Sequence, residues 1–116
     1  MLDQATVLVV SELTCIECDR AFRRAVAVEG LSAAEMARLQ AAAEALWGQC
    51  HVFAFDPAIA ERARGSFPSE PIRTLHALHW AFYESARRAF GGMALLSLDR
   101  RMRAVGLNLG AEVVPE

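Results

Sequence analysis

Three side chains that can bind a metal ion or transfer a proton stand at the junctions of predicted elements. Asp99 directly follows a predicted strand at 93–98, and Glu17 lies in a helix shortly after a predicted strand at 6–10. His76 lies near the start of another predicted helix, where the helix dipole points toward a ligand. In α/β folds such positions converge on the crevice at the carboxyl ends of the strands. Carboxylate oxygens grouped there are the ligands of Mg²⁺ or Mn²⁺, which activate water for attack on phosphate.

The same two acids also have ordinary structural interpretations. An aspartate between a strand and a helix commonly caps that helix, which fits Asp99. Glu17 is spaced to pair with Arg20 on one face of its helix. Spacing alone therefore leaves a structural and a metal-binding role open for both.

The elements that would position these residues alternate between strands and helices, which indicates an α/β domain with a mainly parallel sheet. The continuous apolar run of the first strand is typical of a strand buried on both faces. Strands are predicted at 6–10, 51–55, 93–98 and 112–115. Helices are predicted from Ser11 or Thr14 to about 28, at 32–48, at 57–64, from Ser69 or Pro71 to about 90, and at 100–105, the fourth being the longest.

Local signals place the ends and the buried sides of these helices. Ser32 and Glu35 have the spacing of a capping box, and Asp56 precedes Pro57 as a cap precedes a first helical residue. Apolar residues at helical spacing define the sides expected to be buried. They are Cys15, Cys18, Phe22, Ala25 and Val26; then Met36, Leu39, Ala43 and Leu46; then Leu75, Leu78 or His79, Phe82 and Ala86.

Composition limits the class of protein. The 116 residues, 54% of them apolar, suit one domain with its own core. The net charge of −2 gives no overall attraction to nucleic acid, so an RNA contact needs a local cluster. Two such clusters are present, Arg20, Arg23 and Arg24, and Arg100, Arg101 and Arg103. The apolar runs are too short for a membrane span, and three cysteines without a secretory segment predict free thiols in the cytoplasm.

Three stretches, in order along the chain, resemble the PIN domain family, the fold of VapC-type toxin ribonucleases. Residues 11–17 (SELTCIE) resemble that family's S-E-L-T-x-x-E, residues 72–81 (IRTLHALHWA) resemble I-R-T-L-D-A-L-H-L-A, and residues 96–102 (LSLDRRM) resemble L-T-x-D-x-R-L. The resemblance extends from about Ala5 to Pro115. It implies that residues 1–116 form a single partial domain with a three-layer α/β/α PIN-like fold that lacks the family's first strand and helix.

The resemblance also implies a function, that of a metal-dependent RNA endonuclease toxin from a toxin–antitoxin system. Glu17 and Asp99 match the second and fourth of the family's four acids, His76 stands at the third, and the first is missing. We therefore expect weak binding of Mg²⁺ or Mn²⁺ by Glu17 and Asp99, with His76 as a further catalytic candidate, and impaired activity. Arg73 and Arg100 would hold RNA phosphate. Implied partners are RNA, a small antitoxin protein and a second copy of the chain.

A second hypothesis is a non-catalytic protein- or RNA-binding or oligomerisation module that keeps the PIN fold. The loss of two acids favours it.

Two further patterns have alternative interpretations. A CxxC at Cys15 and Cys18, with Cys50, His51, His76 and His79 elsewhere, would suit a zinc or redox site, whereas the apolar stripe indicates packed thiols. A helical face formed by Arg73, His76, Trp80, Tyr83 and Arg87 would either stack RNA bases or pack its aromatic residues inside the protein, and we favour packing.

Overall fold

The computed structural model describes residues 7–91, 94–96, 102, 104 and 112–115. The chain divides into two compact units, Leu2–Ala54 and Phe55–Glu116. The described residues contain α-helices and two pairs of parallel strands, one pair in each unit. The predicted mixed α/β class with parallel strands is therefore confirmed.

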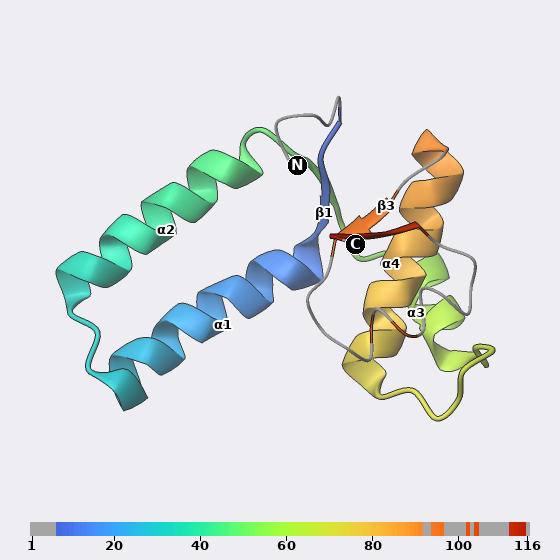
Figure 1. Cartoon of the computed structure of the whole chain (residues 1–116), viewed down its shortest axis with the longest axis horizontal. Coiled ribbons are helices and arrows are strands. Elements are labelled where there is room, and N and C mark those ends of the chain that lie inside the picture. Colours follow the sequence, from blue (N-terminus) through green and yellow to red (C-terminus); the bar gives the residue numbers. More distant parts are fainter. Residues whose placement is uncertain (1–6, 92–93, 97–101, 103, 105–111, 116) are drawn as a thin grey trace. The chain divides into compact units, whose positions relative to one another are not determined.

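The first unit consists of two parallel strands joined by two helices. In chain order these are β1 (Val9–Ser11), α1 (Glu12–Glu29), α2 (Ala33–Trp47) and β2 (His51–Phe53). The two helices lie side by side and run in opposite directions (Figure 1). β1 and β2 pair from Val9 opposite His51 to Ser11 opposite Phe53. A parallel pair needs a long crossover, and the α1–α2 hairpin supplies it.

Ser11 begins α1. Of the two predicted caps it is Ser11 whose Oγ accepts a hydrogen bond from the Thr14 backbone N–H, at 3.0 Å. The helix ends at Gly30, whose φ of 73° lies in the left-handed region that glycine adopts without a Cβ clash. The Leu31 N–H then bonds back to the Ala25 carbonyl at 3.2 Å, which closes the end of the helix.

The capping box predicted for α2 is confirmed. The Ser32 Oγ accepts from the Glu35 N–H at 3.1 Å, and the Glu35 Oε1 accepts from the Ser32 N–H at 3.1 Å. Each side chain thereby satisfies a backbone donor that the first helical turn leaves unpaired. α2 ends at Gly48, as predicted.

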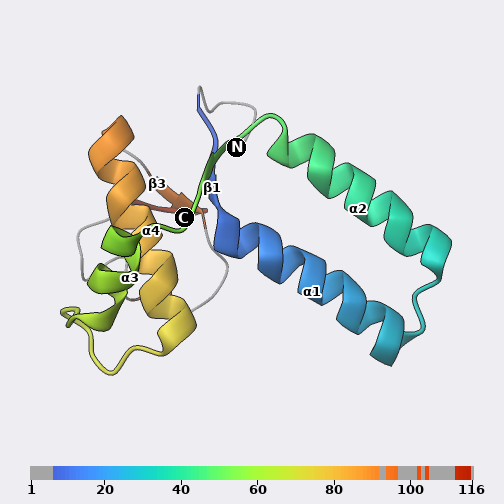
Figure 2. The ribbon, with the colours of Figure 1, turned by 180° about the vertical axis from the view of Figure 1, so that it is seen from behind.

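The second unit contains α3 (Pro57–Arg64), α4 (Thr74–Phe90), β3 (Ala94–Leu96) and β4 (Glu112–Val114). The predicted cap of α3 is confirmed, because the Asp56 Oδ1 accepts from the Ile59 N–H at 2.9 Å. α3 packs against α4, which Figure 2 shows from behind. β3 and β4 are parallel, with Ala94 opposite Glu112 and Leu96 opposite Val114.

The second unit holds most of the buried apolar side chains among the described residues, since Leu13 alone is buried in the first. Trp80 is 0% exposed, and Tyr83 contacts it edge to face with ring centroids 5.3 Å apart. A cluster of buried residues connects three parts of this unit: helix α4, the loop that follows α3, and Met102. Its buried members are Phe67, Ala77, Trp80, Tyr83 and Met102, with Ala63 and Ile72 packed against them.

The predicted start of α4 is wrong. The helix begins at Thr74, not at Ser69 or Pro71, because the preceding residues form a loop closed by Glu70. The Glu70 carboxylate accepts from the Phe67 N–H at 2.8 Å and from the Ile72 N–H at 3.0 Å. The residue before a proline also disfavours helical geometry. α4 therefore has 17 residues, and α1 with 18 is the longest described helix.

The predicted buried sides are correct only in part. Phe82 and Ala86 are buried, but Leu75 is 51% exposed, because packing on this side of α4 begins further along the helix. In α2 no residue is buried, and Leu39 and Leu46 are 42% and 38% exposed. β1 is only half-buried, so a strand buried on both faces is also wrong.

Several predicted bounds changed or lie outside the described residues. β2 ends at Phe53, two residues before the predicted end. β3 and β4 occur within the predicted strands 93–98 and 112–115. Of the predicted helix 100–105, the structure describes Met102 and Ala104, and both are helical.

Candidate functional site

Glu17 lies on α1 in the first unit. The helix begins immediately after β1, so Glu17 follows the carboxyl end of that strand by about one and a half turns. Its side chain is half-buried. The position agrees with a residue at the rim of a parallel sheet.

Arg73 and His76 lie together at the start of α4 in the second unit. Arg73 is the N-cap residue, is exposed, and makes no capping hydrogen bond with its side chain. His76 lies in the first turn and is half-buried. The first backbone N–H groups of a helix attract anions, so an exposed guanidinium beside them favours phosphate.

The remaining predicted site residues, Asp99 and Arg100, lie outside the described part of the chain. Within that part, no three His, Cys, Asp or Glu side chains are placed to hold a metal ion. Convergence of Glu17, Asp99 and His76 on one ion therefore stays a prediction.

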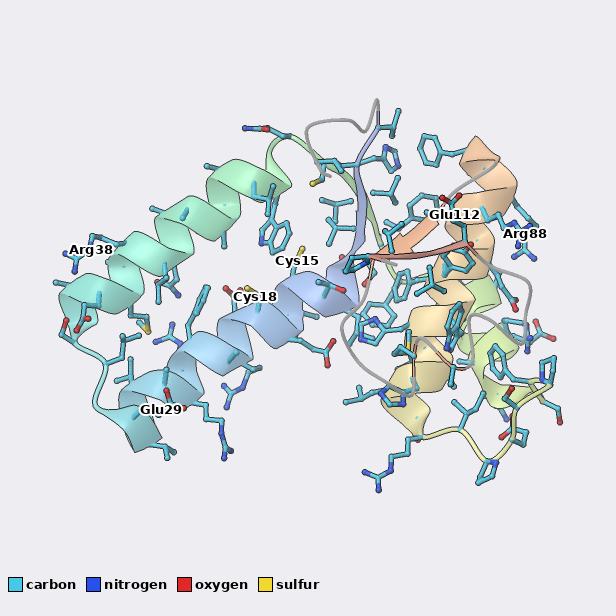
Figure 3. The ribbon with its side chains drawn as sticks, viewed as in Figure 1. Cys15, Cys18, Glu29, Arg38, Arg88 and Glu112 are labelled. Carbon is cyan, nitrogen blue, oxygen red and sulfur yellow. The ribbon has the colours of Figure 1, made fainter. Side chains whose placement is uncertain are left out.

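The thiols of Cys15 and Cys18 lie on the side of α1 that faces α2 (Figure 3). Both are half-buried. Burial raises the pKa of each thiol above 9.0, and the nearby carboxylate of Asp19 raises both further. The thiolate is the form that attacks disulfides and binds metals, so these thiols stay neutral and unreactive at neutral pH. Cys50 donates its S–H to the Leu46 carbonyl at 3.2 Å. These contacts favour packed thiols over a zinc or redox site.

The aromatic residues of α4 are buried. Trp80 and Tyr83 belong to the core cluster, whereas Arg73 and Arg87 on the same helix are exposed. The packing interpretation is thus confirmed, and stacking of RNA bases on these two rings is wrong. The Trp80 Nε1 has no hydrogen-bond partner within the described structure. Such a buried, unpaired donor destabilises a fold by about 1–3 kcal/mol.

Sequence analysis missed Glu70. Its two hydrogen bonds to backbone N–H groups fix the loop that sets where α4 begins, and so they position Arg73. The available signal was an acidic residue next to Pro71, directly before a predicted helix. A carboxylate there can accept hydrogen bonds from the N–H groups of the loop, next to a proline that has no N–H of its own.

None of the helices in the described ranges is both long and apolar enough to cross a membrane. No family model, curated protein or solved structure matches the chain.

Proposed function

We propose that this chain is a PIN-like protein related to the metal-dependent RNA endonuclease toxins of toxin–antitoxin systems, with impaired activity. The observation that supports this most is the passage from β1 into α1. A parallel strand ends, Ser11 caps the helix that follows, and Glu17 stands on that helix. This is the setting that the resemblance requires for the second acid of the site.

The proposal extends to the arrangement of the sheet. It assigns the pairs β1–β2 and β3–β4 to one three-layer α/β/α PIN-like fold without the family's first strand and helix. The parallel direction of both pairs supports this assignment. Related toxins imply a cytoplasmic protein that binds a small antitoxin and forms a dimer with its own copy.

In this proposal each site residue has a role. Glu17 and Asp99 hold Mg²⁺ or Mn²⁺, which when bound supplies activated water for phosphodiester hydrolysis. His76 replaces an acid, and imidazole is a poor ligand for Mg²⁺ but suits softer ions. Arg73 and Arg100 hold phosphate, and the exposed guanidinium of Arg73 at the start of α4 supports that role.

Cleavage of a mixed RNA pool by the purified chain tests the proposal, in Mn²⁺ and in EDTA. Slow cleavage in Mn²⁺ is expected to fall by at least about 10–100-fold in Glu17→Gln and Asp99→Asn, because a metal ligand is lost. Glu44→Gln, an exposed carboxylate on α2, is the matched control and should cleave as the unmodified chain does. Absence of cleavage by folded protein, or cleavage that persists in EDTA, would refute the enzymatic proposal.

A second candidate, the non-catalytic interaction module, is favoured by the apolar surface of the α1–α2 hairpin. Val26, Val28, Leu39 and Leu46 are all exposed there. Leu39 and Leu46 stand seven residues apart on one face of α2. Exposed apolar residues that share one helix face, as Leu39 and Leu46 do, mark a surface that binds another protein.

Sedimentation velocity tests this candidate. If the hairpin mediates self-association, Leu39→Gln/Leu46→Gln shifts the chain to monomer. Ala37→Gln/Ala41→Gln, two exposed positions on the opposite face of α2, should not. A monomeric unmodified chain would exclude self-association.

A further inference from the structure

Three exposed arginines form a compact basic face on α1. Arg20, Arg23 and Arg24 are spaced i, i+3 and i+4, which places them within an arc of about 100° around the helix. None of them has an ion pair with another residue that the structure describes. Residues 20–28 contain no acidic side chain. The three guanidinium groups therefore keep their charge and their donors available to an anion.

The nearest acidic residue to this face on the cysteine side does not cancel its charge. The exposed Asp19 is close enough to the thiols of Cys15 and Cys18 to raise the pKa of both. Arg23 is four residues further along, but the two form no ion pair. From residue 20 onward the arc from Arg23 to Arg24 therefore carries only positive charge, and Glu17 borders it one turn earlier.

We propose that Arg20, Arg23 and Arg24 form a surface that binds the phosphate backbone of single-stranded RNA without reading its sequence. Arginine presents a planar set of donors that matches phosphate oxygens in two-point contacts. From Arg20 onward the only other side chain inside the arc is Ala27, and the exposed Ile16 lies one turn before Arg20. A protein partner would instead need large apolar or aromatic contacts between the charges.

This inference rests on the proposed function, which supplies RNA as the ligand, and it adds a place for the strand to bind. Glu17 stands three residues before Arg20 and seven before Arg24 on one side of α1. Along the helix axis these separations are about 4.5 and 10 Å. RNA held by the arginines would therefore run past the candidate metal ligand.

Binding of a labelled, mixed-sequence, single-stranded RNA to the full chain, followed by fluorescence anisotropy in EDTA, tests the proposal without cleavage. The variable is salt concentration. Three phosphate contacts contribute about −2 to the slope of log K against log salt, at about −0.7 each. The Arg20→Gln/Arg23→Gln/Arg24→Gln variant should lose this part of the slope and bind at least about tenfold more weakly at low salt.

The matched control is Arg64→Gln/Arg87→Gln/Arg88→Gln, which removes three exposed arginines from α3 and α4. Both variants lower the net charge of −2 by three units, so overall electrostatics are equal. The control should keep the slope of the unmodified chain. Replacement of the α1 arginines by lysine keeps the charge, and it should restore most of the slope even if the glutamine variant folds poorly.

Three outcomes would overturn the proposal. The first is that the unmodified chain fails to bind RNA. The second is that both triple variants lose the same part of the slope. The third is that the α1 variant no longer binds polyglutamate but binds RNA as before. The last result would identify an acidic protein segment as the ligand. RNA binding in EDTA without cleavage in Mn²⁺ would instead support the basic face and reject the enzymatic proposal. If the α1 variant keeps both metal-dependent cleavage and unchanged RNA binding, the enzymatic proposal is supported and the basic face is rejected.

Discussion

Arg62 and Glu84 form a two-point ion pair that joins α3 to α4. The Arg62 Nε donates to Glu84 Oε2 at 2.7 Å, and Nη2 donates to Oε1 at 3.1 Å. The same guanidinium donates from Nη1 to the Ser66 carbonyl at 3.1 Å and lies over the ring of Phe67, with Cζ 3.8 Å from the ring centroid. One side chain therefore ties together both helices and the loop that follows α3.

Arg62→Lys should lower the free energy of unfolding by about 1–2 kcal/mol. Lysine keeps the charge but loses the planar group that makes two parallel hydrogen bonds and covers Phe67. Urea denaturation measures the change. Arg64→Lys, an exposed neighbour on α3, should alter stability by less than about 0.5 kcal/mol. Equal losses in the two variants would show that the paired geometry adds nothing.

Trp80→Phe should destabilise the chain far less than Trp80→Ala. Removal of the whole buried ring costs about 3–5 kcal/mol, because it leaves a cavity in the core. Phenylalanine fills much of that space and removes an N–H that has no partner in the described structure, which offsets part of the loss. Urea denaturation of both variants gives the comparison. A Phe variant as unstable as the Ala variant would show that removal of the unpaired N–H does not offset the lost packing.

Sequence predicted those parts of the fold that depend on neighbouring residues. Ser11, the Ser32–Glu35 box and Asp56 act as caps because each bonds to a backbone N–H within three residues. Burial was predicted less well, since it depends on which elements pack together. Leu75 and Leu39 have helical apolar spacing and are nevertheless exposed.

The site was the least predictable part. Glu17 and His76 lie on the expected helices, but spacing along a chain does not fix the distance between helices. The start of α4 was missed because Glu70 bonds to loop N–H groups on both sides of it, and an acidic residue before Pro71 does not by itself specify those two bonds. The burial of Trp80 and Tyr83, by contrast, was predicted correctly, because the size of their aromatic rings favours buried positions.

Ser32→Ala should lower the free energy of unfolding by about 1 kcal/mol, because the Glu35 N–H then loses its acceptor. Circular dichroism during urea denaturation measures the loss. Ser66→Ala is the control, since that exposed side chain lies in a loop and caps no described helix. Unchanged stability of Ser32→Ala would show that α2 begins without the box in solution.

The same capping box predicts a pH dependence. Hydrogen bonds from Ser32 lower the pKa of Glu35 below 4.5 in the folded chain. Because the pKa of Glu35 is lower in the folded chain than in the unfolded chain, the carboxylate's contribution to stability is complete above the unfolded pKa. This contribution is lost as the pH falls through the folded pKa. Thermal unfolding below pH 4.5 should therefore depend less on pH in Glu35→Gln than in the unmodified chain. Glu44→Gln on the same helix is the control.

The thiols of α1 predict a loss of stability as the pH rises, which is the opposite of the effect predicted for Glu35. The folded pKa values of Cys15 and Cys18 are raised, so the neutral thiols stabilise the fold below the unfolded value of 9.0. This contribution is lost as the pH rises through the folded values. Alkylation by iodoacetamide, followed by mass spectrometry, should be slow in the folded chain and faster in urea. Asp19→Asn should speed alkylation of both thiols a few-fold, and an unchanged rate would contradict the charge effect.

The strand pair β1–β2 has a consequence for how the first unit folds. Val9 pairs with His51, which stands 42 residues further along the chain. Closing so long a segment loses much chain entropy unless the intervening residues are already compact. Helices form in about 0.1–1 μs, so α1 and α2 can shorten that distance before the strands meet. We therefore expect pairing of β1 with β2 to be the late, non-local step that limits the folding rate of this unit.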